Sequence, residues 1–182
     1  DDAAGEAFDK VARVLGLSYP GGPNLEALAQ GGDGNAFKFT PAFRGADHLD
    51  FSFSGLKTAV INLLHGFTQR GEEPPRADIA ASFQRAAVEM LLKNTFEAAG
   101  RLGLQKIAFA GGVSANGCLR ETAKQREGYD LYFPRLEFCT DNAAMIGSAA
   151  YYMGLRGTQE APLTLNAYPA LSLIDPSLHK LS

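Results

Sequence analysis

The chain has 182 residues, of which 46% are apolar and 20% charged, and this size suits one domain with a well-buried core. The net charge of −3 excludes the strongly basic composition of dedicated nucleic-acid binding domains, so any contact with RNA would be local. The two cysteines are too few for a disulfide framework, which favours a reducing compartment and predicts a cytoplasmic protein. No apolar stretch reaches the roughly 20 residues that a membrane span requires.

The opening segment predicts an amphipathic helix over residues 2–15. Phe8 and Val11 lie on its apolar side, whereas Glu6 and Asp9 lie on its acidic side. An acidic side usually faces solvent, and nothing local distinguishes Asp9, a candidate ligand for ribose hydroxyls, from its acidic neighbours. Because the sequence begins without a methionine and inside this predicted helix, we expect a fragment of a longer protein.

The next part of the chain predicts a turn, helices and two strands. Clustered glycines and prolines mark the turn, alternating apolar residues mark half-buried strands, and apolar residues spaced three and four apart mark helices. The predicted elements are a turn over 18–23, a short helix from its N-cap Asn24 to Gln30, strands at 37–39 and 49–53, and helices over 56–67 and 78–102.

From Lys106 onward the pattern alternates between strands and helices. The first strand is apolar throughout, as expected of a strand buried on both faces of a sheet. The predicted elements are strands at 107–110 and 130–133, helices over 117–127 and 143–155, and an extended tail over 158–182.

The glycine turn from Gly111 to Asn116 is the strongest local signal of a binding site. A buried strand that leads through paired glycines into a helix presents unpaired backbone N–H groups, where phosphates and nucleosides dock. The alternative is a tight turn that needs glycine only for close packing. Asn116 suits an N-cap as well as a nucleoside contact. Gly22 likewise belongs either to a plain turn or to a ligand clamp.

Asp141 is a second candidate, at the junction before the last helix. Its carboxylate would cap that helix or hold a metal ion, and capping is the commoner role at such a junction. Basic residues near the helix ends form either a local RNA-facing patch or a solvated surface. These basic residues are Lys93, Arg101, Lys106, Arg120, Lys124 and Arg126.

Taken together, the motifs resemble the bacterial tRNA threonylcarbamoyladenosine transferases, a family formerly labelled O-sialoglycoprotein endopeptidase. The resemblance extends over residues 1 to about 156 and rests on ordered runs of the sequence. The runs are Asp1-Asp2-Ala3-Ala4-Gly5-Glu6-Ala7-Phe8-Asp9-Lys10, Tyr19-Pro20-Gly21-Gly22-Pro23, Asp50-Phe51-Ser52-Phe53-Ser54-Gly55-Leu56-Lys57, Ala110-Gly111-Gly112-Val113-Ser114-Ala115-Asn116 and Cys139-Thr140-Asp141-Asn142-Ala143-Ala144-Met145-Ile146.

This resemblance implies an α/β protein with the actin-like, sugar-kinase-like (ribonuclease H-like) fold. Residues 1–157 would form the second lobe, incomplete at its N-terminal side, and residues 158–182 the tail. The family transfers a threonylcarbamoyl group from threonylcarbamoyl-AMP to the exocyclic amine of the adenosine adjoining the anticodon, in tRNAs that read codons beginning with A. Its expected partners are tRNA, a paralogous dimerisation subunit and an ATPase subunit, and no membrane.

The resemblance also assigns roles to single residues. Asp9, Gly22 and Asn116 would contact the nucleoside of the adenylate, and Glu26 stands where some members carry an acidic contact residue. Asp141 matches the family's ligand for one divalent ion, iron or zinc, per subunit. The activated anhydride would need positioning and charge stabilisation rather than a protein nucleophile, so no catalytic residue is assigned.

The sequence departs from the family where two motifs would precede Asp1. The His-x-x-x-His metal motif and the Ser-Gly-Gly-His-Thr phosphate loop are not in this sequence. A single aspartate cannot complete a metal site of three or four ligands, so we expect this chain alone to bind metal weakly and to be inactive. The alternatives are a non-catalytic nucleotide-binding or scaffold module of the same tRNA-modification complex and, less favoured, an actin-like small-molecule kinase.

Overall fold

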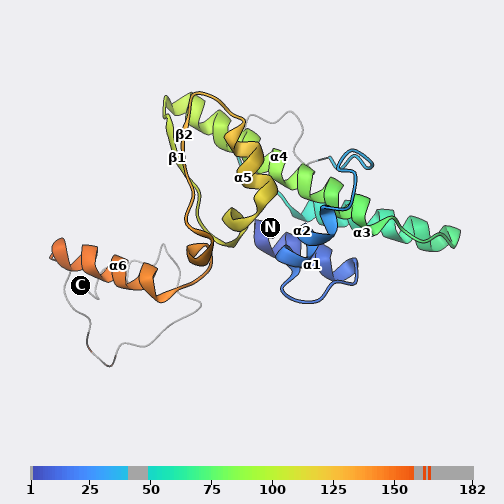
Figure 1. The fold of residues 1–182 in the computed structure, drawn as a ribbon, viewed down its shortest axis with the longest axis horizontal. Helices are drawn as coiled ribbons and strands as arrows, with labels where there is room; N and C mark the ends of the chain where they lie inside the picture. The colour runs from blue at the N-terminus through green and yellow to red at the C-terminus, as the bar shows by residue number, and fades with distance from the viewer. Residues whose placement is uncertain (1, 41–48, 158–161, 163, 165–182) are drawn as a thin grey trace. The chain divides into compact units, whose positions relative to one another are not determined.

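The computed structural model describes residues 2–40, 49–157, 162 and 164, in two compact units, Asp1–Thr140 and Asp141–Ser182 (Figure 1). The predicted tail over residues 158–182 lies outside the described residues, apart from Pro162 and Thr164. The first unit contains, in chain order, α1 (Ala4–Val14), α2 (Gly21–Ala29), α3 (Ser54–Arg70), α4 (Arg76–Leu102), β1 (Lys106–Ala108), the 3₁₀ helix η1 (Gly112–Ala115), α5 (Gly117–Lys124), β2 (Asp130–Tyr132) and the 3₁₀ helix η2 (Leu136–Phe138). The second unit contains α6 (Ala143–Leu155).

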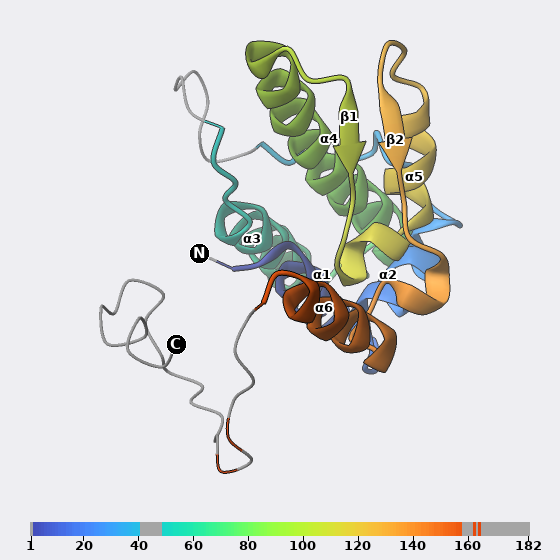
Figure 2. The same ribbon diagram turned by 90° about the vertical axis from the view of Figure 1, so that its left-hand side faces the viewer.

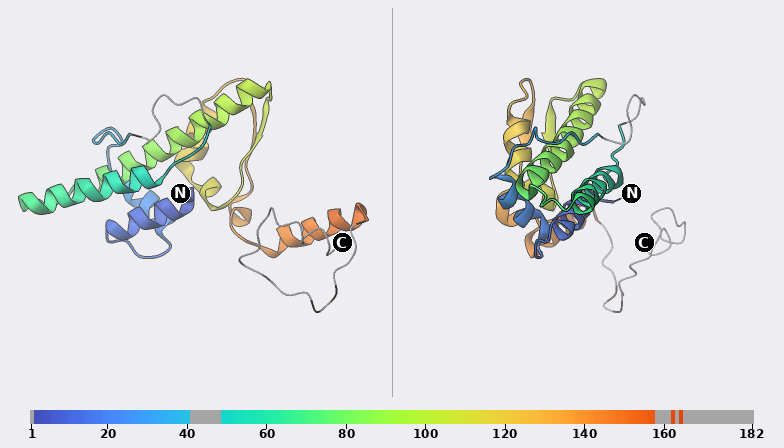
Figure 3. Two further views of the ribbon diagram at one scale, coloured as in Figure 1. Left: turned by 180° about the vertical axis from the view of Figure 1, so that it is seen from behind. Right: turned by 90° about the vertical axis from the view of Figure 1, so that its right-hand side faces the viewer.

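The long helix α4 contributes to both cores of the first unit. Its 27 residues extend over about 40 Å at the usual rise of about 1.5 Å per residue. In its first half, Phe83 is fully buried and meets the ring of Phe8 edge-to-face at 5.2 Å, within a core shared with α1, α2 and α3. Figure 3 shows α3 and this half of α4 side by side. The core of the second half packs Val88 and Phe96 against Leu119 of α5.

The strands β1 and β2 form a parallel pair in which Ile107 lies opposite Leu131. Both side chains are half-buried and pack in the second core, on the side of α4 and α5 (Figure 2). Lys106 and Ala108 on the alternate positions of β1 are exposed. The prediction of a strand buried on both faces was therefore wrong, because α4 and α5 cover only one face of this sheet.

The predicted strands at 37–39 and 49–53 do not form among the described residues, and residues 41–48 lie outside them. The backbone of both segments is instead bonded to side chains of α4. The N–H of Phe37 donates to Ser82 Oγ at 3.1 Å, and Asn94 Nδ2 donates to the carbonyl of Asp50 at 2.9 Å. The alternating aromatic pattern there reflects rings that pack toward the first core, since Phe39 is half-buried and Phe53 buried. Among the described residues, neither segment pairs with a strand.

The predicted helices are confirmed in α1, α3, α4, α5 and α6, with ends that differ by a few residues. The helix α2 begins earlier than predicted, at Gly21 rather than after Asn24. Proline lacks an N–H, so Pro23 fits the first turn of α2, where backbone N–H groups have no partner within the helix. Asn24 does not cap α2, because its Nδ2 donates to the carbonyl of Ser18 at 2.9 Å. Within the described residues, no helix combines the length and hydropathy needed to cross a membrane.

Candidate functional site

Asp9 on α1 is bonded to the start of α2. Its Oδ1 accepts a hydrogen bond from the backbone N–H of Gly22 at 3.2 Å. The acidic residues nearby have different partners, because Asp2, just before α1, and Glu6 both pair with Lys10 at 2.7 Å. The structure therefore distinguishes Asp9 from its acidic neighbours, which the sequence pattern did not.

The paired glycines of α2 differ in their surroundings. A Cβ on Gly21 would lie 2.6 Å from the Cα of Asp9, whereas a Cβ on Gly22 would meet no atom within 4 Å. Gly21 is thus required for the close approach of α1 and α2. Gly22 leaves open space beside the carboxylate of Asp9, as a ligand clamp would need.

Glu26 connects α2 to the first turn of α5. Its Oε1 accepts a hydrogen bond from the N–H of Gly117 at 2.7 Å. Gly22 and Glu26 are four residues apart and therefore lie on one face of α2. This face is bonded to α1 at one end and to α5 at the other, which links three of the predicted residues, Asp9, Gly22 and Glu26, to the N-terminus of α5.

Asn116 is the N-cap of α5, as one of its two sequence readings predicted. Its Oδ1 accepts from the N–H of Leu119 at 2.9 Å. Its Nδ2 donates to Oε1 of Gln84 on α4 at 2.8 Å, and both side chains are buried. Gln84 was not among the predicted site residues, although an uncharged polar residue within an otherwise apolar helix stripe is a signal that can be read from sequence.

The glycine turn needs glycine at one position for its backbone. Gly111 has φ +83°, in a region that residues with a Cβ avoid. The next residues form η1, and Ser114 Oγ in this turn is buried without a hydrogen-bond partner among the described residues. Such buried, unpaired hydroxyls are uncommon in folded proteins.

Arg120 braces this turn from α5. Its guanidinium donates to the carbonyls of Ser114 at 2.6 Å and Pro134 at 2.7 Å, and it lies 5.1 Å from the ring centroid of Phe133. Arg120 therefore holds η1 and the end of β2 together. For this residue, neither alternative, a local RNA-facing patch or a solvated surface, describes the structure, because its donors are directed into the protein.

Asp141 does not cap α6. Asn142 takes that position, with Oδ1 accepting from the N–H of Met145 at 3.0 Å, so the capping reading of Asp141 was wrong. The Asp141 side chain is exposed. Among the described residues, no group of three or more His, Cys, Asp or Glu side chains is arranged to hold a metal ion. By itself, the donor set around Asp141 does not fit the divalent ion that the resemblance implies.

Among the described residues of the first unit, four titratable groups have shifted pKa values: Asp2, Glu6, Lys10 and Cys118. Hydrogen bonds from Lys10 and Lys57 lower the pKa of Asp2, which stabilises its ionised form. Burial raises the pKa of the Cys118 thiol, so this cysteine is less reactive than a free thiol at neutral pH. Asp2 therefore serves as an ionised tie between α1 and α3, and Cys118 is not suited to be a nucleophile.

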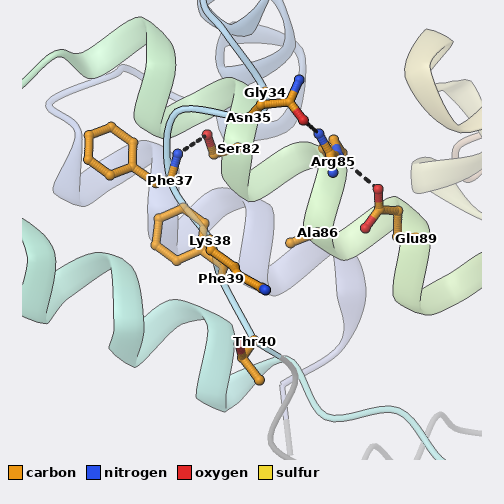
Figure 4. A pocket seen from close by; sticks show the side chains of 10 residues that line it. All are labelled: Gly34, Asn35, Phe37, Lys38, Phe39, Thr40, Ser82, Arg85, Ala86 and Glu89. Atoms are coloured by element: carbon orange, nitrogen blue, oxygen red, sulfur yellow. Dashed lines mark hydrogen bonds and ion pairs between the residues drawn. The ribbon is translucent and has the colours of Figure 1, made fainter.

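The cavities lie elsewhere. One of about 420 Å³ is bordered by α4 and the segment before residue 41 (Figure 4), and none of the five predicted site residues lines it. Its lining includes Phe39, Lys38 and Arg85, and the Arg85 guanidinium pairs with Glu89 at 2.7 Å. A second cavity of about 390 Å³ is lined in part by Gln84 and Cys118. Asp9, Gly22 and Glu26 thus form a hydrogen-bonded cluster with the start of α5 and line neither of these two cavities.

Comparison with solved structures shows a likeness of fold. A crystal structure of HypF from T. kodakarensis matches with a TM-score of 0.64 and 22% sequence identity, over 86% of this chain and 20% of that chain. At this identity the match describes the arrangement of elements only. It agrees with an α/β fold built around a small parallel sheet.

Comparison with sequences is more specific. The model of the tRNA N6-adenosine threonylcarbamoyltransferase family matches residues 1–148. Curated members from Moorella thermoacetica and Clostridium botulinum are 57% and 51% identical over 176 residues, each covering 95% of this chain. The chain spans about half the length of these relatives, 51% and 52%. By this match, the chain belongs to the tRNA N6-adenosine threonylcarbamoyltransferase family.

Proposed function

We propose that the whole protein carrying this chain transfers a threonylcarbamoyl group from threonylcarbamoyl-AMP to the exocyclic amine of the adenosine adjoining the tRNA anticodon. Curated relatives at 51–57% identity carry the name of this activity. Within the chain, the main support is the hydrogen-bonded cluster that links Asp9, Gly22 and Glu26 to the N-terminus of α5. Residues 1–157 would form the second lobe of an actin-like fold, with the nucleotide at this cluster.

The cluster offers chemistry that suits a nucleotide. Asp9 is exposed and uses Oδ1 to accept from Gly22, so its second oxygen can accept from ribose hydroxyls. The open space at Gly22 lets a sugar or base approach the backbone. Asn116 would contribute a second amide hydrogen at the start of α5. The unpaired hydroxyl of Ser114 is a further group that a ligand or another part of the whole protein would satisfy.

The transfer needs little covalent chemistry from the protein. The adenosine amine attacks the carbamoyl carbon, the bond from that carbon to the phosphate oxygen breaks, and AMP leaves with the electron pair while the amine loses a proton. The anhydride is already activated, so holding the two reactants in line supplies much of the rate. Residues of the cluster would therefore act by fixing the AMP half of the substrate.

The divalent ion of the family, iron or zinc, would supply charge stabilisation at the transferred group when bound. Asp141 is the candidate ligand in this chain, and its partners would come from outside the described residues. For the cellular context, we propose a cytoplasmic protein that acts on tRNA with a paralogous subunit and an ATPase subunit.

A transfer assay tests the proposed function. A full-length protein carrying this sequence is incubated with threonylcarbamoyl-AMP and unmodified tRNA, and the modified nucleoside is measured by mass spectrometry. We expect transfer by the full-length protein, none by this chain alone, and a loss of about 10- to 100-fold for Asp9→Ala, the range for losing hydrogen bonds to a charged group. Glu121→Ala is the control, since Glu121 is exposed on α5 and should leave transfer unchanged.

Two outcomes would contradict the proposal. Transfer by this chain alone at the full-length rate would show that the cluster is not one part of a larger site. Tight AMP binding by the full-length protein without transfer, in the presence of the partner subunits, would favour a non-catalytic nucleotide-binding module.

A further inference from the structure

Gln84 is a polar residue at a buried position in the middle of α4. Its side chain is 8% exposed, and Ala80, Ala87 and Val88, one turn away on the same side of the helix, are essentially fully buried. Burying an amide costs free energy unless its polar atoms are hydrogen-bonded. An apolar side chain at this position would carry no such cost, so the hydrogen bond that Gln84 makes is the feature to explain.

That hydrogen bond fixes the orientation of the Asn116 amide. Nδ2 of Asn116 donates to Oε1 of Gln84 at 2.8 Å, while Oδ1 accepts from the N–H of Leu119 at 2.9 Å. The cap alone would leave the amino group of a 93% buried side chain without a partner, because Asn116 is 7% exposed. With both bonds made, the carbonyl is directed to the α5 backbone and the amino group to α4.

The orientation determines what Asn116 can offer to a ligand. An asparagine amino group carries two hydrogens, and Gln84 accepts one of them. The second remains as a donor for a ring nitrogen or ribose oxygen of a nucleoside. The next residue, Gly117, is held by Glu26 of α2, so the first turn of α5 is fixed from two helices.

We propose that Gln84 is a positioning residue for the nucleotide site, an inference that rests on the proposed function. It does not contact the ligand, but it holds the Asn116 amide so that its second hydrogen is presented as a donor to the nucleoside of threonylcarbamoyl-AMP. Gln84 and Asn116 then act as one unit in nucleotide binding.

Binding of AMP to the full-length protein, measured by calorimetry, tests this role. We expect Gln84→Leu to raise the Kd for AMP about tenfold, because it removes the acceptor for Asn116. Gln84→Glu keeps an acceptor oxygen at the same place and should leave the Kd within about threefold of wild type. Ser82→Ala is the matched control. Ser82 is also buried on α4 but bonds to Asp33 and Phe37, so its loss should lower the melting temperature without changing the Kd.

A double-mutant cycle separates positioning from a general loss of stability. Asn116→Ser retains a good N-cap but has no amino group to donate to Gln84. In that background we expect Gln84→Leu to cause no further rise in Kd. An unchanged Kd in folded Gln84→Leu, or an equal rise in both backgrounds, would overturn the proposal.

The orientation of the Asn116 amide can be measured without an activity or binding assay. In NMR spectra of the full-length protein, the Asn116 side-chain amide protons should exchange slowly in wild type and rapidly in Gln84→Leu. If exchange is slow but the wild type shows no detectable AMP binding, the bond to Gln84 is supported and the nucleotide site of the proposed function is refuted. Rapid exchange in wild type would refute the positioning role itself.

Discussion

At the residue scale, the acidic side chains in α1 and just before it have separate roles that depend on their partners. Asp2 bonds Lys10 of α1 at 2.7 Å and Lys57 of α3 at 2.9 Å, so its carboxylate ties the two helices together. Glu6 pairs with Lys10 within α1. Asp9 bonds the N–H of Gly22 and stays exposed. Charge pattern alone could not separate these residues, because Lys57 and Gly22 are distant from them in sequence.

The lowered pKa of Asp2 predicts a specific dependence of stability on pH. A carboxylate whose pKa is lower in the folded state than its ordinary value of about 3.9 contributes stability above that value, and this stability is lost as the pH falls through the folded pKa. We therefore expect Asp2→Asn to lower the melting temperature of the chain at pH 6. The difference from wild type should shrink steadily below about pH 4.

Melting curves recorded between pH 6 and pH 2.5 measure this effect. Lys57→Met is the companion variant, because it removes one of the two hydrogen bonds that lower the pKa of Asp2. Lys57→Met should lower the melting temperature at pH 6 by less than Asp2→Asn does, and its difference from wild type should shrink in the same way at lower pH. A constant difference between Asp2→Asn and wild type across this pH range would contradict the assignment.

At the element scale, α2 connects the parts of the candidate site. It is bonded to α1 through Gly22 and to α5 through Glu26, and it packs closely on α1 because Gly21 has no side chain. One glycine of the pair therefore serves packing and the other leaves open space. Alanine substitutions at Gly21 and Gly22 therefore test the two roles separately.

Gly21→Ala and Gly22→Ala should have opposite effects on stability. The new Cβ at Gly21 would lie 2.6 Å from the Cα of Asp9, so we expect a loss of about 1–3 kcal/mol, as for other overpacked sites. Gly22→Ala meets no atom within 4 Å and should be neutral or stabilising by up to about 1 kcal/mol. Urea denaturation of both variants measures these values. Equal destabilisation would show that α2 does not pack as described.

In the full-length protein, the proposed function adds a second expectation for the same pair. Gly22→Ala should weaken AMP binding although it leaves the fold intact, because its methyl group occupies the space left for the ligand. Unchanged AMP binding by this variant would remove Gly22 from the site.

The sequence predicted elements with long periodic patterns better than it predicted strands or tertiary contacts. The apolar stripes of α1 and α4 were sufficient because helix periodicity is local. Alternation at 37–39 and 49–53 predicted strands that do not form there, because each segment bonds to α4. For the site, motif resemblance predicts roles for Asp9 and Asn116, whereas the bond of Asn116 to Gln84 joins residues 32 positions apart, so a local pattern could not predict that pairing.

At the scale of the whole molecule, the predicted site residues of the first unit line neither of the two cavities, although Gln84 borders the second. The cavity of about 420 Å³ is lined by residues between Gly34 and Glu89 and includes none of the predicted site residues. The cluster at α2 and α5 instead joins helix ends through hydrogen bonds, with Asp9 exposed beside the open space at Gly22. A chain that spans about half the length of its relatives would present such an open half-site, with the remainder of the pocket supplied by the rest of the protein.

Hydrogen–deuterium exchange of the full-length protein with and without AMP tests whether the nucleotide binds beside α2 and α5. We expect AMP to slow exchange in the peptides covering Gly21–Ala29 and Gly117–Lys124, and Gln84→Leu to reduce the protection of the second peptide. Protection confined to peptides covering residues 34–40 and 82–89, which contain the lining residues of the 420 Å³ cavity, would contradict this expectation and place the nucleotide in that cavity.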